Sequence, residues 1–358
     1  VIKELKAAAE AEAAGGENKL IAIVAPAIAS QFQYVPLGKV ITGIKKLGFA
    51  KVLEVAVGAD MVAYKEGLEL VEKGFLTSSC CPAFVKYIET KHPAMIPHIS
   101  HNLSPMAELG RSIKEHEPDV KIVFIGPCIA KKAERELPGM QSAGAGSDVD
   151  LVLTTRELAR IVRAEHIDVE QLADSPFDDP LGNGSGAGVI FGATGGVMEA
   201  ALRSAYFLTT GENPSADAFC EVRAAENESR PWREAAFDLA GTTIHCAVAS
   251  GLANARHLIR AIKRREVHYE FVEIMACPGG CAGGGGQPVD GSDREKAASR
   301  GDVLFSLDEK AELRFSHENP AVKALYNEYL SSPCSERAEE LLHCDHFAWQ
   351  MPQTGIHV

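Results

Sequence analysis

The sequence lacks any apolar run long enough to cross a membrane. None of its 358 residues lies in a stretch that approaches the roughly 20 consecutive apolar residues needed to span a bilayer. Residues 1–19 also lack the cationic start and the apolar core of a secretory signal. We therefore expect a cytoplasmic protein without a membrane segment, in which residues 1–19 form a poorly defined N-terminal segment.

A surplus of positive charge is missing as well. The formal net charge is −13 at pH 7, whereas proteins that bind nucleic acids draw much of their affinity from neutralising phosphates. This balance argues against a nucleic-acid partner. With 46% hydrophobic and 24% charged residues, the chain has an ordinary globular composition and can bury a sizeable core.

The cysteines do not suit a framework of paired disulfides. There are nine of them, an odd number, in a large chain that shows no secretory features. This usage favours metal or redox chemistry. The cysteines are Cys80, Cys81, Cys128, Cys220, Cys246, Cys277, Cys281, Cys334 and Cys344.

Short apolar runs alternate with helical patterns along most of the chain. The apolar runs lie at 19–26, 50–57, 119–126, 148–155, 243–250 and 269–276. Continuous apolar strands of this kind suit parallel sheets that are covered on both faces. The sequence therefore predicts an α/β fold built on mostly parallel sheets, with Thr154 or Thr155 as a helix N-cap and loops at 171–188 and 282–303.

The segment CPGGC, from Cys277 to Cys281, follows the apolar run at 269–276 and precedes AGGGGQP. Four consecutive glycines let the backbone approach a bulky group closely and leave amides free to face sulfide or another anion. The segment therefore indicates a binding site. A flexible glycine-rich connector and a zinc site are the two alternatives.

Cys128 follows the run KIVFIG and a proline, at the expected start of a helix. There the helix dipole and free amides stabilise a thiolate, which suits a metal ligand. Lys131 lies on the same helical face, and Glu134 extends that face by another turn. For this segment alone, a solvated face beside a buried cysteine is an equal alternative.

Cys81, in the segment TSSCCPAF, raises the candidate ligands to four. Together with Cys128, Cys277 and Cys281 it would supply thiolates from three separate loops after strands. That arrangement fits an iron–sulfur cluster better than a zinc ribbon, which usually takes two close cysteine pairs. The remaining thiols away from these segments are expected to be small buried apolar groups.

Three segments together resemble the signature segments of the catalytic domain of FeFe-hydrogenases. They are TSSCCPAF, IGPCIAKKAE and EIMACPGGCAGGGGQP, and the segments FGATGGVMEAALRSAY and SHENPAV are similar to further parts of that family. The resemblance implies two lobes, each on a mostly parallel sheet flanked by helices, with the metal cluster buried between them. The H-cluster domain would cover residues 20–358, with approximate lobes at 20–145 and 146–310 and a helical tail at 311–358.

The resemblance also implies a cofactor and the residues that hold it. The ligands of a 4Fe-4S cluster would be Cys81, Cys128, Cys277 and Cys281. Cys281 would also bridge to a diiron centre that carries CO, cyanide and an azadithiolate, which completes the H-cluster. Lys131, Met275, Pro26 and Ala27 would contact the diiron centre. A buried lysine suits this task because cyanide is an anionic acceptor.

A proton path is implied by the same resemblance. Cys80 would face the open iron and pass protons to the azadithiolate amine, because the pKa of a thiol, about 8.5, lies close to working pH. The path would continue through Glu134, Ser100 and Glu69. Lys73 would pair with the outer glutamate.

Several positions depart from the family pattern. The segment TSSCCP carries an extra serine at Ser79, and Ala83 and Phe84 replace Gly and Trp. Gly126 replaces a Met, and Met106 replaces a Gln. We therefore expect a reshaped pocket around the diiron centre.

The partners would be an electron donor and maturation enzymes. The sequence has no spare CxxC runs for accessory clusters, so electrons would come from a ferredoxin-like carrier or an electron-transfer subunit. One candidate docking surface is the basic stretch of Arg256, Arg260, Lys263, Arg264 and Arg265, and a solvated helix face is the alternative.

The implied function is that of an FeFe-hydrogenase, an oxidoreductase that reversibly reduces protons to hydrogen. A hydrogen sensor with the same cluster is the first alternative, which the presence of Cys80 disfavours. A non-catalytic iron–sulfur protein related to hydrogenases is the second. Such a protein would have no use for Lys131 or Cys80.

Overall fold

The structure is a computed structural model that describes residues 1–142, 146–179, 181–223, 230–289, 296–333 and 335–348. Its first sheet, sheet A, has the strand order β2-β1-β4-β7 and is parallel throughout. Its strands are β1 (Leu20–Val24), β2 (Lys51–Glu54), β4 (Lys121–Gly126) and β7 (Leu151–Thr154). Every residue of β1 is buried, as the continuous apolar runs predict for a sheet covered on both faces.

The second sheet, sheet B, has the strand order β3-β10-β9-β8. Its strands are β3 (Leu76–Thr77), β10 (Phe271–Met275), β9 (Thr242–Ser250) and β8 (Arg233–Leu239). Only β8 is antiparallel. It joins β9 through Ala240 and Gly241, which both have positive φ, the backbone of a tight two-residue hairpin.

The two sheets draw their strands from interleaved parts of the chain. Strand β3 belongs to sheet B although it lies between two strands of sheet A, and β7 completes sheet A after residue 146. A boundary at residues 145 and 146 therefore does not separate the two sheets. Residues 2–13 form α1 (Ile2–Ala13), which lies against sheet A.

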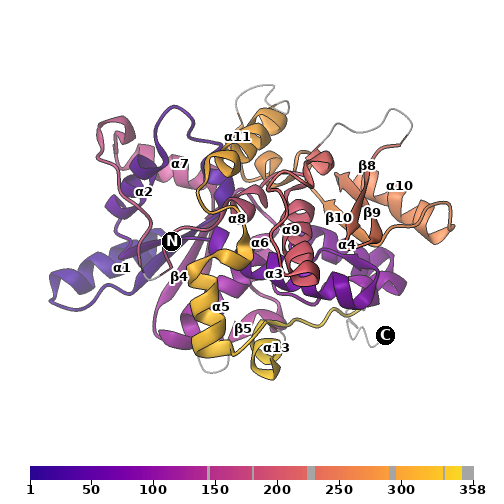
Figure 1. Ribbon diagram of the computed structural model, residues 1–358. Coiled ribbons are helices and arrows are strands. Elements are labelled where there is room, and N and C mark those ends of the chain that lie inside the picture. The colour runs from indigo at the N-terminus through magenta and orange to yellow at the C-terminus, as the bar shows by residue number, and fades with distance from the viewer. Residues whose placement is uncertain (143–145, 180, 224–229, 290–295, 334, 349–358) are drawn as a thin grey trace, which may run out of the picture.

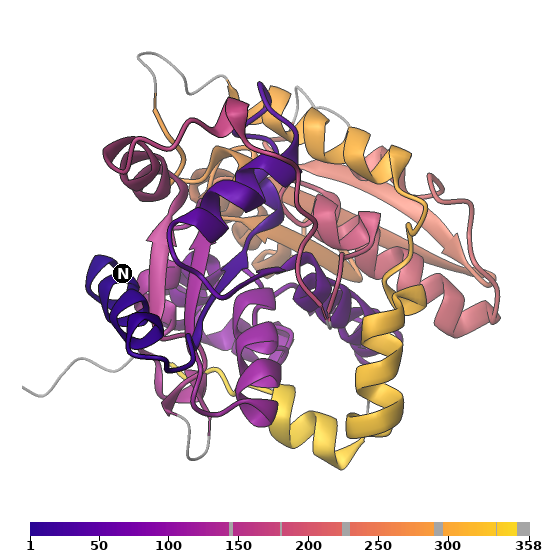
Figure 2. The same ribbon diagram turned by 90° about the vertical axis from the view of Figure 1, so that its left-hand side faces the viewer.

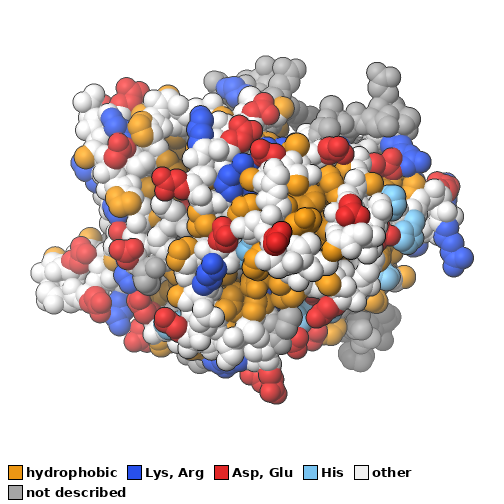
Figure 3. All heavy atoms as spheres, viewed as in Figure 1, with side chains coloured by type: hydrophobic (Ala, Val, Ile, Leu, Met, Phe, Trp, Pro, Cys, Tyr) orange, Lys and Arg blue, Asp and Glu red, His pale blue; other side chains and the backbone are white. Residues whose placement is uncertain are grey.

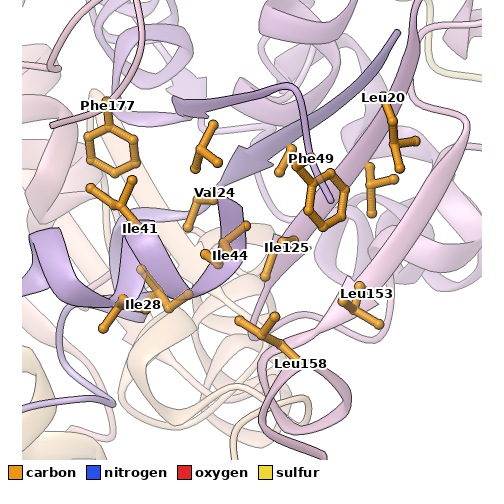
Figure 4. Close-up of a cluster of buried hydrophobic side chains, with 14 of the residues drawn as sticks. Leu20, Val24, Ile28, Ile41, Ile44, Phe49, Ile125, Leu153, Leu158 and Phe177 are labelled. Atoms are coloured by element: carbon orange, nitrogen blue, oxygen red, sulfur yellow. The ribbon is translucent and has the colours of Figure 1, made fainter. Parts of the chain in front are cut away.

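Helices cover both faces of sheet A. The helices α1, α2 (Leu37–Lys46) and α7 (Thr155–Ala164) bury the apolar cluster of Figure 4, in which Val24, Ile44 and Leu158 meet. The opposite face packs on α5 (Pro105–His116), which in turn contacts α3 (Ala56–Lys73). Thr154 caps α7 in a capping box with Glu157, which confirms the expected helix start.

Between the sheets, α3 packs on α8 (Gly186–Ile190) and α9 (Gly196–Thr210). The helices α4 (Pro82–Lys91) and α10 (Leu252–Lys263) cover the other face of sheet B. Figure 1 shows α1 and α2 at one end of the molecule and α10 at the opposite end.

The C-terminal helices return across the earlier parts of the chain. They are α11 (Lys296–Lys310), α12 (Pro320–Leu325) and α13 (Glu336–Leu342), and a π-helical turn spans Tyr326–Leu330. The helices α12 and α13 reach α3 and α5, respectively, and curve past them in Figure 2. The expected loop at 282–303 was too long, because α11 begins at Lys296.

None of the helices that the structure describes is both long and apolar enough to cross a membrane.

Candidate functional site

One cavity of about 410 Å³ opens where the parallel strands of both sheets end. Sheet A contributes residues 25–27 after β1 and residues 127–131 after β4. Sheet B contributes residues 80–83 after β3 and residues from 275 to 285 at and after β10. Ligands of open α/β sheets bind at this edge, beyond the carboxyl ends of the strands.

All four cysteines predicted as ligands line this cavity, each on a short connection after a strand. Burial raises the pKa of the Cys281 thiol well above its usual value, and the nearby Cys128, Cys81 and Cys277 raise it further. The four thiols are thus close enough to affect one another. A second cavity of about 380 Å³, between α3, α5 and α12, has no cysteine in its wall.

Backbone amides near the cysteines favour their thiolate forms. The amides of Phe84 and Ala276 lower the pKa of Cys81, and that of Gly285 lowers the pKa of Cys277. The amide of Lys131 does the same for Cys128. Burial still raises the pKa of these thiols, but each amide opposes that effect because it stabilises the thiolate.

Glycines bring the Cys128 loop and the CPGGC segment into backbone contact. A Cβ added to Gly284 would lie 2.5 Å from the carbonyl oxygen of Pro127. The N–H of Gly286 donates to that same carbonyl at 2.7 Å. Gly280 has a φ of +75°, and a Cβ there would meet the backbone nitrogen of Thr194 at 2.9 Å.

The residues present fit a four-cysteine iron–sulfur cluster. Among the residues described, no three His, Cys, Asp or Glu side chains form a group that could hold a single metal ion. The cysteines instead surround a cavity large enough for a group of several atoms. Thiolates that accept backbone N–H bonds are the usual donors to such clusters.

Among the described residues, Lys131 is the one cationic side chain in the wall of this cavity. Its ammonium lies 2.7 Å from Glu134 Oε2 and donates to the carbonyl of Cys80 at 3.4 Å. Burial lowers the pKa of Lys131, but Glu134, Cys128 and Cys80 outweigh burial and the net pKa is raised. The wall therefore offers a fixed positive charge to an anionic group.

The other predicted contacts also lie in the cavity wall. Pro26 and Ala27 form a short 3-10 turn after β1, and Met275 ends β10. Ala27 and Met275 are almost fully buried, at 1% and 2% exposed. The structure thus brings together all the residues expected to contact the diiron centre.

Cys80 lines the cavity beside its neighbour Cys81 but packs on a different group of side chains. It contacts the apolar cluster that contains Ala59 and Met275. Burial raises the pKa of its thiol well above the usual value, and the carboxylate of Glu66 raises it further.

Glu66, on α3, is the acidic residue next to Cys80 that the sequence interpretation missed. Its carboxyl is completely buried and accepts the backbone N–H of Ser79 at 3.2 Å. Burial, followed by repulsion from Glu69, raises its pKa to about 8. Its Oε2 atom has no hydrogen-bond partner among the described residues. The backbone of the additional Ser79 therefore binds a buried acid that lies close enough to Cys80 to affect its thiol.

Ser100 and Glu69 meet through Asn102. The Asn102 side chain donates to Ser100 Oγ at 2.9 Å and to Glu69 Oε2 at 3.2 Å. The Lys73 ammonium pairs with Glu69 Oε1 at 2.9 Å, as expected. Ser79 Oγ donates to the Asn102 carbonyl at 2.8 Å, which links this group to the Cys80 segment.

Glu134 is not joined to Ser100 by any hydrogen bond that the described residues form, and it pairs with Lys131 instead. Glu66 is instead the carboxyl whose charge, after burial, raises the pKa of the Cys80 thiol. The spacing of Glu66 and Glu69, three residues apart on one helix, was the available signal. It could not show that α3 passes beside Cys80.

Two departures from the family pattern have a structural reason. A Cβ at Gly126 would lie 2.5 Å from the ring of Phe124, which itself lines the cavity. Phe124 thus fills the space that a longer side chain at 126 would need. Phe84 is completely buried in the apolar cluster between α4, α10 and sheet B.

The basic stretch lies on α10 and the turn after it. Basic and histidine side chains gather at the edge of the molecule that carries this helix (Figure 3), while acidic side chains are spread over the viewed face. The first turn of α10 adjoins the CPGGC segment, because Gly251 N–H donates to Met275 and Gly279 N–H donates to Ser250 Oγ. Arg264 and Arg265 lie at the far end of the helix.

Family comparisons agree with this site. The family described as "Iron only hydrogenase large subunit, C-terminal domain" matches residues 18–285, and "Iron hydrogenase small subunit" matches residues 294–349. The NADP-reducing hydrogenase subunit HndD of Solidesulfovibrio fructosivorans is 38% identical over 333 residues, covering 87% of this chain and 56% of that protein. Iron hydrogenase 1 of Clostridium pasteurianum is 38% identical over 324 residues, with shares of 86% and 56%. The chain thus spans little more than half the length of these relatives.

A solved structure of apo FeFe-hydrogenase HydA1 from Chlamydomonas reinhardtii, a variant, matches with a TM-score of 0.83 and 32% identity. The match covers 97% of this chain and 98% of that one. Cytosolic iron-sulfur assembly component 3 of Mus musculus is more distant, at 28% identity over 386 residues, with 98% of this chain and 79% of that protein covered.

Proposed function

Because the chain belongs to the iron-only hydrogenase family, we propose that it reversibly reduces protons to hydrogen with electrons from a ferredoxin-like donor. One observation carries the proposal. Four cysteines, the cation of Lys131 and the thiol of Cys80 all line one buried cavity between two sheets. An iron–sulfur assembly protein needs the four cysteines, but it has no evident use for the other two groups.

The H-cluster would supply the redox chemistry, and the chain would hold and orient it. Its 4Fe-4S part would bind Cys81, Cys128, Cys277 and Cys281. The diiron part, with its CO, cyanide and azadithiolate ligands, would lie against Pro26, Ala27 and Met275. The Lys131 ammonium would donate a charge-assisted hydrogen bond to an anionic ligand of that part.

Protons would reach the cavity along α3. Cys80 would exchange a proton with Glu66, whose raised pKa of about 8 suits transfer near neutral pH. Asn102 joins Ser100 to Glu69, which pairs with Lys73, and this group would pass protons on to Glu66. Glu134 would hold the Lys131 ammonium in place rather than carry protons.

Infrared spectroscopy after treatment with the maturation enzymes tests the proposal. The matured protein should show CO and cyanide bands and should evolve hydrogen from a reduced viologen. If the same maturation system activates a known hydrogenase but produces neither signal here, the hydrogenase proposal is refuted. Ordinary cubane absorbance alone would favour an assembly role like that named for the distant Mus musculus relative.

The effect of replacing Cys80 distinguishes a hydrogen-evolving enzyme from a hydrogen sensor with the same cluster. In a turnover enzyme, Cys80→Ala should abolish most hydrogen evolution and leave the infrared bands in place. In a sensor, turnover of the unmodified protein should already be slow, and the substitution should change it little.

An electron carrier would dock near the CPGGC segment, and the basic stretch of α10 is the proposed attractive surface. Reversing Arg256 and Arg260 to Glu should raise the apparent KM for an acidic ferredoxin a few-fold and weaken its salt dependence. Lys6→Glu, at the opposite end of the molecule, is the matched control. A cytoplasmic location belongs to the same proposal, and the eight described cysteines form no disulfide.

A further inference from the structure

A segment near the C-terminus covers the outer end of the proposed proton path. The N–H of Leu103 donates to the Leu342 carbonyl at 3.1 Å, and the N–H of Cys344 donates to the His101 carbonyl at 2.7 Å. Asn102 and His343 form an antiparallel bridge between these two hydrogen bonds. Backbone pairing therefore fixes residues 342–344 against the residues that follow Ser100.

This pairing gathers three partly exposed histidines around Glu69. The ring of His101 lies 5.7 Å from that of His343 and 6.1 Å from that of His346, measured between centroids. The N–H of His101 donates to Glu69 Oε1 at 3.2 Å. His346 Nε2 lies 3.0 Å from the Ser100 carbonyl, where it anchors the segment.

The charged groups around His343 come from several elements. Burial lowers the pKa of His343, and Lys65 of α3 and His101 lower it further. Glu69 of α3 and Glu339 of α13 oppose this effect. The net pKa of His343 is lowered, so its ring is mostly neutral at neutral pH.

A neutral imidazole can accept a proton on one nitrogen and donate one from the other. The side chains that bind Glu69 directly do not suit this task, because the Lys73 ammonium has donors but no acceptor site and the Asn102 amide does not titrate. His101 bonds Glu69 through its backbone N–H, and His343 pairs with Asn102, so their two rings are the titratable groups beside Glu69 that can both accept and donate a proton.

We propose that His101 and His343 form the solvent-side proton-exchange pair of this protein. A proton leaves a ring nitrogen of the pair for the Glu69 carboxylate, and the ring takes a replacement proton from water or buffer. His346 keeps the covering segment in place. This role rests on the proposed hydrogenase function, because it serves the path that ends at Cys80.

The first test uses the matured protein with both histidines replaced, His101→Ala and His343→Ala. Hydrogen evolution should fall about tenfold, less than the 10²–10⁴-fold range typical of direct general acid–base catalysis. The viologen KM and the infrared bands should not change. Added imidazole should restore the rate, and the pH profile should shift, which a purely structural defect would not produce.

The control is His268→Ala, a histidine whose side chain is 80% exposed and pairs with Glu270 far from this segment. It should keep the parent rate and pH profile. An unchanged rate in the double variant, or a lost rate that imidazole does not restore, would overturn the exchange pair while the hydrogenase function stands.

The second test needs no cofactor. Histidine resonances of the metal-free protein are titrated by NMR, with and without Glu69→Gln. Loss of the nearby carboxylate should lower the pKa of His343 further, because Glu69 favours the protonated ring. A His343 titration that Glu69→Gln leaves unchanged would overturn the proposal. A matured protein that evolves no hydrogen would instead refute the function on which the proposal rests.

Discussion

The two sides of the cavity are built by different means. On the side of Cys128 and the CPGGC segment, main-chain contacts set the geometry, because Gly284 and Gly286 lie directly on Pro127. On the side of α3, hydrogen bonds to two individual carboxyl groups hold Glu66 and Glu69 in place. We therefore expect cluster retention to depend on backbone shape and proton delivery to depend on individual functional groups.

The two adjacent cysteines should give the largest difference. We expect Cys81→Ser to lose most bound iron and the 4Fe-4S absorbance after reconstitution, because one of the four thiolates is removed. Cys80→Ser should keep the cluster and lose most hydrogen evolution. Iron analysis and electron paramagnetic resonance measure the first effect, and a viologen assay measures the second. Equal iron loss in both variants would contradict the division between the two sides.

Substitutions of the two candidate acids, Glu66 and Glu134, should give the next largest difference. Glu66→Gln keeps the hydrogen bond from Ser79 but removes the transferable proton, so hydrogen evolution should fall by roughly 10²–10⁴-fold with the cluster retained. Glu134→Gln weakens the ion pair with Lys131 and should disturb the infrared bands more than the proton supply. A Glu134 variant that loses activity with unchanged bands, while Glu66→Gln stays active, would restore the path expected from the sequence.

A backbone change tests the opposite side. Gly284→Ala places a Cβ 2.5 Å from the Pro127 carbonyl oxygen and should destabilise the protein by about 1–3 kcal/mol, since the contacting atom is main chain. Chemical denaturation measures this loss, and iron content should fall with it. Gly74→Ala is a control without a clash, since nothing lies within 4 Å, although its φ of +69° adds some strain. A Gly284→Ala variant with the stability and iron content of the parent would show that the close approach is dispensable.

The pH dependence of the metal-free protein tests the buried acid directly. The pKa of Glu66 is raised from 4.5 to about 8, so the folded state binds its proton more tightly than the unfolded state. Stability from this group is present below pH 4.5 and is lost as pH rises to about 8, by roughly 1.4 kcal/mol per pH unit at most. Glu66→Gln should flatten the slope of unfolding free energy against pH in that window. Parallel slopes for the two proteins would show that Glu66 is not the buried acid responsible.

The sequence predicted the parts of the fold that depend on local patterns. Apolar runs gave the strands of sheet A and the strands β9 and β10, and Thr154 gave the start of α7. Strand β8 was not predicted. It lies at the antiparallel edge of sheet B, and exposed residues alternate along it with more buried ones, so it has no continuous apolar run. Strand β3 was not predicted because its two residues are too few to show a periodic pattern.

The site residues that belong to short sequence motifs could be predicted. All four cysteines, Lys131, Met275 and the turn at Pro26 lie in the cavity as expected. Glu134 came into the expected path through the family resemblance, whereas the structure pairs it with Lys131. Glu66 lies on a helix whose position beside Cys80 is set by packing of α3 on α9, which no local pattern records.

The interleaving of the two sheets has a consequence for the order of folding. Sheet A has all of its described strands once residue 154 has been synthesised, whereas the strand that pairs with β3, β10, lies almost two hundred residues further along the chain. During synthesis, the sheet that carries Cys128 can therefore be complete while β3, the strand before Cys81, still lacks its partner strand. The wall made by β3 and β10 forms late, so the cavity stays open for most of the time that the chain is being made.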